Sequence, residues 1–357
     1  MKPKFTIADR TIGLGHPTFI IAEMSGNHGQ DFDRAVAIVK AAKEAGADAI
    51  KLQTYTPDTI TMDSDKEWFV VGGDKTPDDW KKKTLYELYK TSYTPWDWHP
   101  KLQALAKDMG LIFFSTPFDP TAVDFLEGLD VPCYKIASYE VTDIPLIKKV
   151  ATTGKPVIMS VGFASLEEIE LAVRTLRENG AKDIALLHCV TAYADEPELS
   201  SMNLRTIQDL AERFGVVSGF SDNNAGIEAP ALASAMGASI IEKHFIGSRA
   251  DGGPDTRFSL EAKEFADMVK RIRRDEQTMG SPKYGPSNAA EEYNTRYRKS
   301  LFVVKDVKKG EMFTPDNLRS IRPAFGLPSK HMEEILGKVA SQDIERGSPM
   351  KWEYVVR

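Results

Sequence analysis

Residues 156–188, PVIMSVGFASLEEIELAVRTLRENGAKDIALLH, contain the repeating unit that decides the fold. The apolar run Pro156–Ser160 has the length of a buried strand, and Leu166–Asn179 places its apolar residues three and four positions apart, as an amphipathic helix does. Gly180 follows this helix, where a left-handed cap is favoured, and Ile184–His188 is a second apolar run. The unit therefore predicts two parallel strands joined by a helical crossover.

The same alternation runs through most of the chain. Apolar runs of strand length recur, and most are separated by a helical pattern such as Phe32–Ala45. The predicted strands are Phe19–Ala22, Ala49–Gln53, Leu111–Ser115, Tyr134–Ile136, Pro156–Ser160, Ile184–His188, Val216–Phe220 and Ile240–His244. Eight such units predict an α/β fold in which a parallel sheet closes into a (β/α)8 TIM barrel of roughly 250 residues.

An open, doubly wound sheet is the alternative architecture. We favour the barrel because polar residues follow the C-terminal end of nearly every predicted strand. A barrel uses such residues from many strands in a ring of catalytic loops, whereas an open sheet has one crevice at its switch point.

The regular pattern is interrupted twice. A long polar and aromatic insert lies between Gln53 and Leu102. An insert of this length is typical of a lid or binding loop, with a surface excursion as the alternative. A stretch rich in Ser, Pro, Gly and Asn then follows the last predicted helix. We therefore assign residues 1–281 to the barrel, 282–297 to a linker and 298–357 to a small, β-rich domain.

Composition and charge exclude several classes of function. The chain has 46 basic and 52 acidic residues, a formal net charge of −6, so it lacks the basic surface that nucleic-acid binding needs. No apolar run approaches the ~20 residues that cross a bilayer, and the N-terminus lacks the apolar core of a signal peptide. The two cysteines, Cys133 and Cys189, lie far apart in apolar runs, as reduced thiols do. We expect a cytoplasmic enzyme with small-molecule substrates and no nucleic-acid or membrane partner.

Residues at the predicted strand ends suit the binding of a small phosphate. Because side chains alternate along a strand, Lys51 and Gln53 point the same way, and so do Glu242 and His244. Cations and hydroxyl groups are gathered at these ends: Lys51, Lys135, Thr116, Ser138, Ser160 and Ser221. With backbone amides at Gly162 and Gly226, they predict an anion cradle.

Acidic side chains add two further roles. Glu23 is the candidate base, because proton transfer requires a carboxylate within hydrogen-bond reach. Glu242, His244 and Asp255 could hold a divalent cation. Alternatively, Glu242 forms an internal salt bridge with Lys243, and the segment around Asp255 is an ordinary turn.

The strand-end segments also resemble, in the same order, those of the sialic acid synthase family of phosphoenolpyruvate-dependent nonulosonic acid synthases. The segments are AEMSGNH (22–28), KLQTYTPDT (51–59), FSTPFD (114–119), YKIAS (134–138), LLHC (186–189), GFSD (219–222), IIEKHF (240–245) and GGPD (252–255). The tail at 299–328 is similar to that family's C-terminal antifreeze-like (SAF) domain. Residues 85–102 and 134–147 resemble most the pseudaminic acid synthase branch, with Tyr139 where the N-acetylneuraminate branch usually has Gly.

The resemblance implies a reaction and a set of roles. In that branch, phosphoenolpyruvate condenses with 2,4-diacetamido-2,4,6-trideoxy-L-altrose and water, giving a nine-carbon nonulosonic acid and phosphate by C–O cleavage. The implied catalytic residues are Glu23, Lys51, Gln53 and Asp255. Phosphoenolpyruvate would bind Lys51, Thr116, Lys135, Ser138, Ser160 and Ser221, and the sugar would bind Tyr193, Glu140 and Arg322. A divalent cation (Mn, Mg or Co) would bind His244 and Asn223, and Arg322 would reach the partner's substrate in a domain-swapped homodimer.

Asn223 departs from the family pattern, which has His at this position of the Ser-Asp-His-Thr motif. An amide oxygen in place of an imidazole nitrogen shifts the metal preference toward Mg or Mn. The outcome is a weaker metal site, a compensating ligand from elsewhere, or lost activity.

Other functions therefore stay open. They are an N-acetylneuraminate or legionaminate synthase, a metal-assisted aldolase or isomerase on the same barrel, and a catalytically degenerate sugar-phosphate binding protein. The tail also has an alternative role, as a dimer staple that touches no substrate.

Overall fold

The computed structural model describes residues 3–72, 82–193, 197–253 and 255–356. They form two compact units, Met1–Gly280 and Ser281–Arg357, which are described separately. Within the described residues, no helix is both long and apolar enough to cross a membrane.

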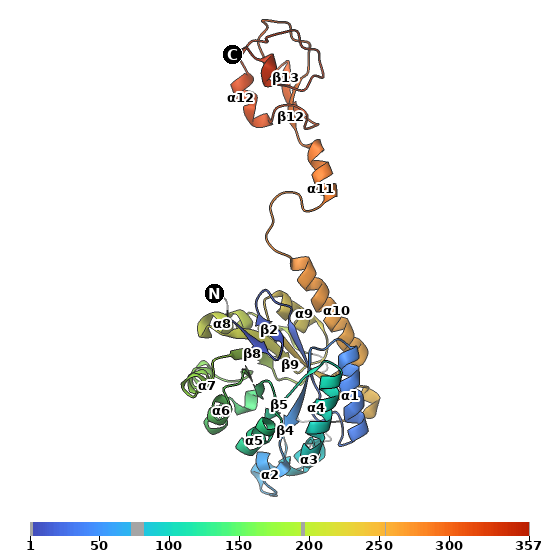
Figure 1. Cartoon of the computed structure of the whole chain (residues 1–357), viewed down its shortest axis with the longest axis vertical. Coiled ribbons are helices and arrows are strands. Elements are labelled where there is room, and N and C mark those ends of the chain that lie inside the picture. The colour runs from blue at the N-terminus through green and yellow to red at the C-terminus, as the bar shows by residue number, and fades with distance from the viewer. Residues whose placement is uncertain (1–2, 73–81, 194–196, 254, 357) are drawn as a thin grey trace. The chain divides into compact units, whose positions relative to one another are not determined.

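The first unit is a closed barrel of eight parallel strands, which confirms the predicted TIM barrel (Figure 1). Its strands are β3 (Phe19–Glu23), β4 (Ala49–Thr54), β5 (Ile112–Pro117), β6 (Tyr134–Ile136), β7 (Val157–Ser160), β8 (Ile184–Val190), β9 (Val217–Asp222) and β10 (Ile240–Ile246). Neighbours pair in sequence order, and β10 closes the ring by pairing with both β9 and β3. The short β11 (Leu260–Glu261) extends the edge of β10.

Helices surround these strands as crossover connections (Figure 1). They are α1 (Phe32–Glu44), α4 (His99–Asp108), α5 (Pro120–Gly128), α6 (Ile144–Ala151), α7 (Leu166–Glu178), α8 (Thr206–Phe214), α9 (Glu228–Ala235) and α10 (Ala262–Met279). In α7, the buried residues include Ile169, Ala172 and Leu176, the face that the sequence predicts. Gly215 ends α8 at φ 62°, in the left-handed conformation expected of it.

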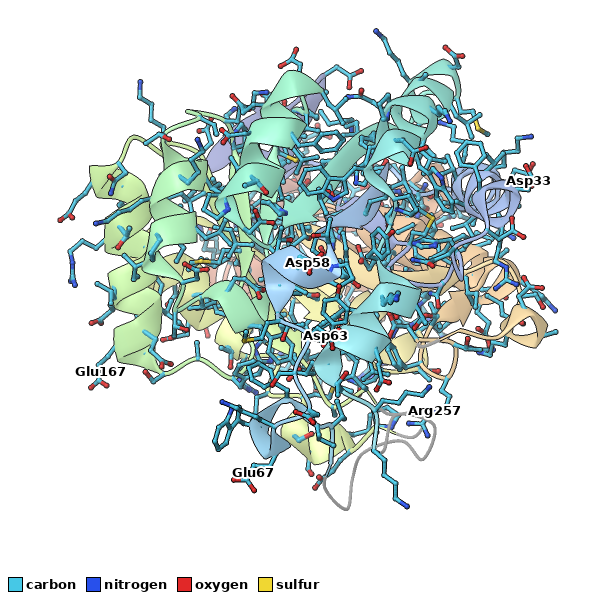
Figure 2. All side chains as sticks on the ribbon, turned by 90° about the horizontal axis from the view of Figure 1, so that it is seen from below. Asp33, Asp58, Asp63, Glu67, Glu167 and Arg257 are labelled. Carbon is cyan, nitrogen blue, oxygen red and sulfur yellow. The ribbon has the colours of Figure 1, made fainter. Side chains whose placement is uncertain are left out.

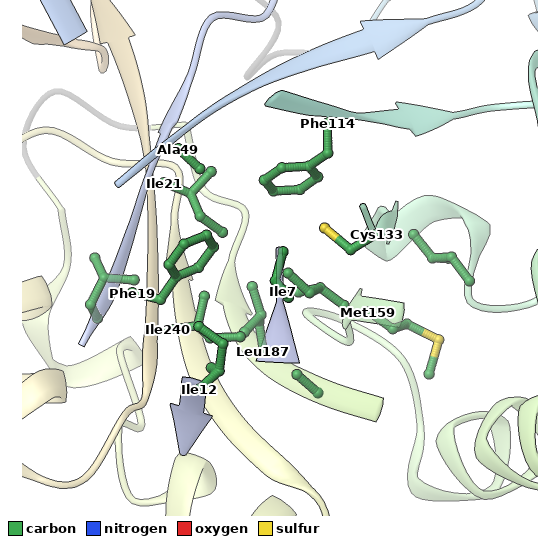
Figure 3. Packing of buried hydrophobic residues seen from close by; sticks show 14 of the residues in the cluster. Ile7, Ile12, Phe19, Ile21, Ala49, Phe114, Cys133, Met159, Leu187 and Ile240 are labelled. Carbon is green, nitrogen blue, oxygen red and sulfur yellow. The ribbon is translucent and has the colours of Figure 1, made fainter. Parts of the chain in front are cut away.

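An N-terminal β-hairpin was not predicted. It pairs β1 (Lys4–Ile7) with β2 (Arg10–Gly13), and β2 contacts β9. Ile7 and Ile12 of the hairpin are almost fully buried and belong to the same apolar core as the barrel strands. Figure 3 shows them beside barrel residues that include Phe19, Leu187 and Ile240.

The long insert after β4 contains α2 (Pro57–Ile60), η1 (Glu67–Phe69), α3 (Leu85–Ser92) and η2 (Trp96–Trp98). Residues 73–81 of the insert lie outside the described residues. Figure 2 labels three acidic side chains of the insert, with Asp58 and Asp63 near the middle of the view and Glu67 near its lower edge. Trp96 attaches the insert to the barrel, because its ring stacks on Phe125 and its Nε1 donates to the Tyr55 carbonyl oxygen at 3.1 Å.

Two buried histidines join the insert to the barrel. His28 accepts at Nδ1 from the Gln30 backbone amide, so neutral His28 carries its proton on Nε2, which lies 3.0 Å from Thr94 Oγ1. His99 Nε2 lies 2.9 Å from Thr54 Oγ1. Burial lowers the pKa of both imidazoles to about 4, aided at His28 by repulsion from His99 and Arg34.

These pKa shifts predict that stability falls in mild acid. An unfolded histidine takes up a proton near its ordinary pKa of about 6.5, whereas the folded imidazoles stay neutral down to about pH 4. The unfolded state therefore binds more protons between these values, and each histidine lowers the free energy of unfolding by about 3 kcal/mol as the pH falls from 6.5 to 4. Urea unfolding at a series of pH values checks this. His28→Asn and His99→Asn should flatten the dependence, and His16→Asn, at an exposed site, should leave it as steep as in the wild type.

The second unit begins with α11 (Ala289–Asn294) and η6 (Thr295–Tyr297), inside the stretch expected to be a linker. It continues with β12 (Ser300–Val303), which pairs antiparallel with β13 (Leu318–Ile321), and then η7 (Ser329–His331), α12 (Met332–Ile335) and η8 (Trp352–Tyr354). It has its own apolar core, which includes Leu301, Val303, Phe313, Leu318 and Ile335.

Candidate active site

Four buried charged side chains form the centre of the site. Lys51 Nζ lies 2.5 Å from Glu23 Oε2 and 3.7 Å from Glu242 Oε1. Lys135 Nζ lies 3.6 Å from the same oxygen of Glu242. All four residues are at most 5% exposed. Charges this deeply buried are costly unless they pair with one another or with a ligand.

The strand register explains why these residues meet. Glu23 is paired with Lys51 across β3 and β4, and with His244 across β3 and β10. Glu242 is paired with Ser221 across β10 and β9. Residues far apart in the sequence therefore meet at the C-terminal ends of neighbouring strands, where TIM-barrel active sites lie.

Hydroxyl groups surround the two lysines. Lys51 donates to Thr116 Oγ1 at 3.2 Å, and Lys135 donates to Ser160 Oγ at 2.7 Å. The Gly162 backbone amide donates to Ser138 Oγ at 3.1 Å, and a Cβ at Gly162 would lie only 3.0 Å from this oxygen. The close approach therefore favours glycine at this position.

The two lysines differ in how well their charges are balanced. Burial disfavours the charged form of Lys51, but Glu23 and Glu242 outweigh it and raise the pKa of Lys51. Burial prevails at Lys135 and lowers its pKa, because attraction to Glu242 compensates only in part and Lys51 adds repulsion. Burial also disfavours the Glu242 carboxylate, yet the two lysines hold the pKa of Glu242 below its ordinary value. An anion beside Lys135 would supply the missing compensation.

These residues line a small cavity of about 60 Å³. Most of the predicted site residues lie on its wall: Glu23, Lys51, Gln53, Thr116, Lys135, Ser138, Ser160, Tyr193, Ser221, Asn223 and His244.

The residues expected to hold a metal are on the same wall. His244 Nδ1 is buried without a hydrogen-bond partner among the described residues, 3.7 Å from Asp255 Oδ2. Asn223 Nδ2 donates a hydrogen bond to Cys189 Sγ at 3.8 Å. The amide oxygen, Oδ1, is then the atom that can coordinate a cation. Within the described part of the chain, no group of three or more His, Cys, Asp or Glu side chains is arranged to hold a metal ion. The donors fit a divalent cation whose remaining ligands are water or substrate.

Family models match both units of the chain. The model described as the NeuB family matches residues 38–284, and that of the SAF domain matches residues 298–356. The chain belongs to the NeuB family. This confirms the resemblance that the strand-end motifs predict, and the SAF match confirms the predicted class of the C-terminal domain.

Relatives of known type support the same assignment to the NeuB family. Pseudaminic acid synthase from Campylobacter jejuni is 42% identical over 333 residues, which cover 93% of this chain and 95% of that protein. N,N'-diacetyllegionaminic acid synthase from Legionella pneumophila is 34% identical over 347 residues, 96% of each. The crystal structure of the spore coat polysaccharide biosynthesis protein SpsE from Bacillus subtilis, at 33% identity and TM-score 0.66, covers 99% of both chains. The chain is an enzyme, a phosphoenolpyruvate-dependent nonulosonic acid synthase of the NeuB family.

Three of the predicted residues lie elsewhere than on the cavity wall. Asp255 is beside it, in contact with Ser25 and near His244. Glu140 is half-buried next to Tyr139, which does line the cavity. Arg322 belongs to the second unit.

The structure gives Glu242 a different position from the one expected. The sequence predicts that it binds a metal together with His244 and Asp255, with an ion pair to Lys243 as the alternative. Instead it lies between Lys51 and Lys135 and accepts from Ser221 Oγ at 3.0 Å. Lys243 points to the other side of β10 and pairs with Asp222 at 2.7 Å.

Sequence reasoning missed several residues of the site. Phe118, Cys189 and Thr191 line the cavity. Tyr139 also lines it and packs edge-to-face on Phe163, whereas the sequence indicates it only as a mark of the branch. Cys189 could have been found, because it follows His188 at the end of a predicted strand, the position from which other site residues were selected.

Proposed function

We propose that this enzyme is a pseudaminic acid synthase, which condenses phosphoenolpyruvate with 2,4-diacetamido-2,4,6-trideoxy-L-altrose and water. The observation that carries the proposal is the pair of buried lysines flanking Glu242 inside a shell of hydroxyl groups, with Glu23 beside them. Identity of 42% over 93% of the chain to a pseudaminic acid synthase supports this branch of the family.

Phosphoenolpyruvate binds against the lysines. Its phosphate and carboxylate take hydrogen bonds from Lys51, Lys135, Thr116, Ser138, Ser160 and Ser221. The anionic substrate restores the charge balance that burial disturbs at Lys135, whose pKa lies below its ordinary value in the ligand-free site. The ammonium groups and hydroxyls are preorganised by contacts with one another, so little reorganisation accompanies binding.

The reaction forms one carbon–carbon bond and, at C2, replaces the carbon–oxygen bond to phosphate with a bond to an oxygen from water. C3 of phosphoenolpyruvate attacks the aldehyde carbon of the open-chain sugar, and positive charge develops at C2. Water adds to C2, and Glu23 accepts its proton. The tetrahedral intermediate then loses phosphate by cleavage of the bond between C2 and the bridging oxygen, while the C2 hydroxyl loses its proton and becomes the carbonyl. The oxygen of the former aldehyde takes up a proton and becomes a hydroxyl group. Gln53 donates to Glu23 Oε1 at 3.0 Å and so fixes the orientation of the carboxylate.

His244 and Asn223 would hold a divalent cation. When bound, such an ion stabilises negative charge on a carbonyl oxygen. Its amide ligand makes Mg or Mn the favoured ion, with Co the third candidate.

The sugar contacts Tyr193, Glu140 and Asp255. Burial raises the pKa of Glu140 to about 7, so near neutral pH this carboxyl is partly protonated and can donate a hydrogen bond. Its Oε2 has no hydrogen-bond partner within the described residues, which suits a ligand contact. Arg322 completes the sugar site of a partner subunit in a domain-swapped homodimer.

Release of inorganic phosphate tests this proposal. The protein is incubated with phosphoenolpyruvate, each of the three sugar precursors (pseudaminic, legionaminic and N-acetylneuraminic), and Mg, Mn or Co, with EDTA as control. We expect release with the diacetamido-altrose precursor, abolished by EDTA and restored by excess metal. Release only with another precursor would assign the enzyme to that branch. If no phosphate is released with any sugar or metal, a catalytically degenerate binding protein would be the better account.

A further inference from the structure

A residue outside the predicted site, Ser25, occupies a strained position at its edge. It lies two residues after Glu23 and is 5% exposed. Its φ is 48°, a left-handed conformation that favours glycine and is unfavourable for a residue with a Cβ. Strain of this kind persists where the surrounding structure enforces it, and it often accompanies function.

The Ser25 hydroxyl connects two functional side chains. Gln53 Nε2 lies 3.0 Å from Ser25 Oγ, and Ser25 Oγ in turn makes a short hydrogen bond to Asp255 Oδ2. The Gln53 amide nitrogen can only donate, so Ser25 Oγ must accept from it, and the serine proton is left for the Asp255 carboxylate. The direction of both hydrogen bonds is therefore fixed.

This chain of contacts extends to the candidate base. Gln53 Nε2 also donates to Glu23 Oε1 at 3.0 Å, so Glu23, Gln53, Ser25 and Asp255 form one continuous network. It joins the end of β3 to the loop that follows β10. The Asp255 backbone is held separately, because its carbonyl oxygen accepts from Ser259 Oγ at 2.7 Å. Ser25 therefore acts on the orientation of the Asp255 carboxylate.

We propose that Ser25 is a positioning residue that holds the Asp255 carboxylate in register with Gln53 and Glu23, and that the strained backbone is retained for this hydroxyl. The inference rests on the proposed function, in which Asp255 contacts the sugar. Glycine would relieve the backbone strain but would remove the only atom of residue 25 that reaches both partners.

The test compares Ser25→Gly with Ser25→Ala. Both remove the hydroxyl, but only glycine relieves the strain. We expect kcat/KM for the sugar to fall about 10- to 100-fold in both variants, with KM for phosphoenolpyruvate within about twofold of wild type. The unfolding temperature should be higher for Ser25→Gly than for Ser25→Ala, because only glycine relieves the backbone strain. Ala8→Gly is the matched control, because Ala8 has φ 52° in the N-terminal hairpin and carries no hydroxyl. It should keep full activity.

A double-mutant cycle with Asp255→Ala separates positioning from a general structural role. If Ser25 acts through Asp255, Ser25→Gly should cause little further loss of kcat/KM when Asp255 is already alanine. Multiplicative losses, or wild-type kcat/KM in Ser25→Gly, would overturn the inference.

If the wild type turns over no precursor, the proposed function fails, and the same cycle is then measured on unfolding temperature. Coupled shifts would still support the contact between Ser25 and Asp255 as the reason for the strain, and additive shifts would overturn it.

Discussion

Glu23→Gln is expected to lower kcat by about 10³-fold while the protein stays folded. Glutamine keeps the shape of the side chain but cannot accept the proton of the water that adds to C2 in the proposed reaction. The variant also removes a negative charge 2.5 Å from Lys51, which makes the cradle more positive. KM for phosphoenolpyruvate should therefore stay the same or fall. Steady-state phosphate release, with circular dichroism to confirm folding, checks both expectations.

Lys51→Ala should have the opposite effect on KM for phosphoenolpyruvate. It removes a cation from the cradle, so KM for phosphoenolpyruvate should rise along with the loss of kcat. Glu44→Gln, at an exposed position of α1, is the matched control and should behave as the wild type.

A kcat for Glu23→Gln within threefold of the wild type would show that Glu23 is not the base.

Asp222→Ala should cost about 3–5 kcal/mol of stability, the largest effect that we expect on folding. Asp222 is fully buried and pairs with the equally buried Lys243 at 2.7 Å. Its other carboxylate oxygen accepts from the Asn224 backbone amide and side chain at 3.1 and 3.0 Å. Alanine would leave the Lys243 ammonium without its counter-charge on the helix-facing side of β10. The free energy of unfolding in urea measures the loss.

A paired substitution separates the charge effect from packing. Asp222→Leu with Lys243→Met removes both charges and should recover much of the stability lost in Asp222→Ala, because a buried ion pair is often replaceable by apolar side chains. Asp209→Ala breaks the exposed ion pair with Arg213 and should leave the unfolding midpoint unchanged. Equal effects of Asp222→Ala and Asp209→Ala would contradict the importance assigned to the buried pair.

The barrel was predictable because its strands are apolar runs bounded by helical periodicity. All eight predicted strands are present, and each end either coincides with the prediction or differs from it by one or two residues. The hairpin at residues 4–13 was not predictable from the sequence. Its strands are only four residues long, which is too short for an alternation of apolar and polar residues to be recognised. Its burial depends on the apolar interior of the barrel, which exists only after the sheet has closed.

The sequence predicted most of the residues that form the site, but not the contacts between them. Alternation along β10 correctly placed Glu242 and His244 on the same side of the strand. The partners of Glu242 lie on β4, β6 and β9, and the positions of these strands around the ring are not given by local sequence patterns. Ser25 was missed for a different reason, since its importance comes from a backbone conformation that its residue type does not favour.

The central claim is that this cavity holds phosphoenolpyruvate for condensation with cleavage of the C–O bond. Phosphoenolpyruvate carrying a heavy oxygen isotope at the position that bridges C2 and phosphorus tests it most directly. After turnover with the diacetamido-altrose precursor, mass spectrometry locates the label. We predict that the label leaves with inorganic phosphate and is absent from the nine-carbon product. Label retained in the product would mean that the phosphorus–oxygen bond breaks instead, and would contradict the addition of water at C2.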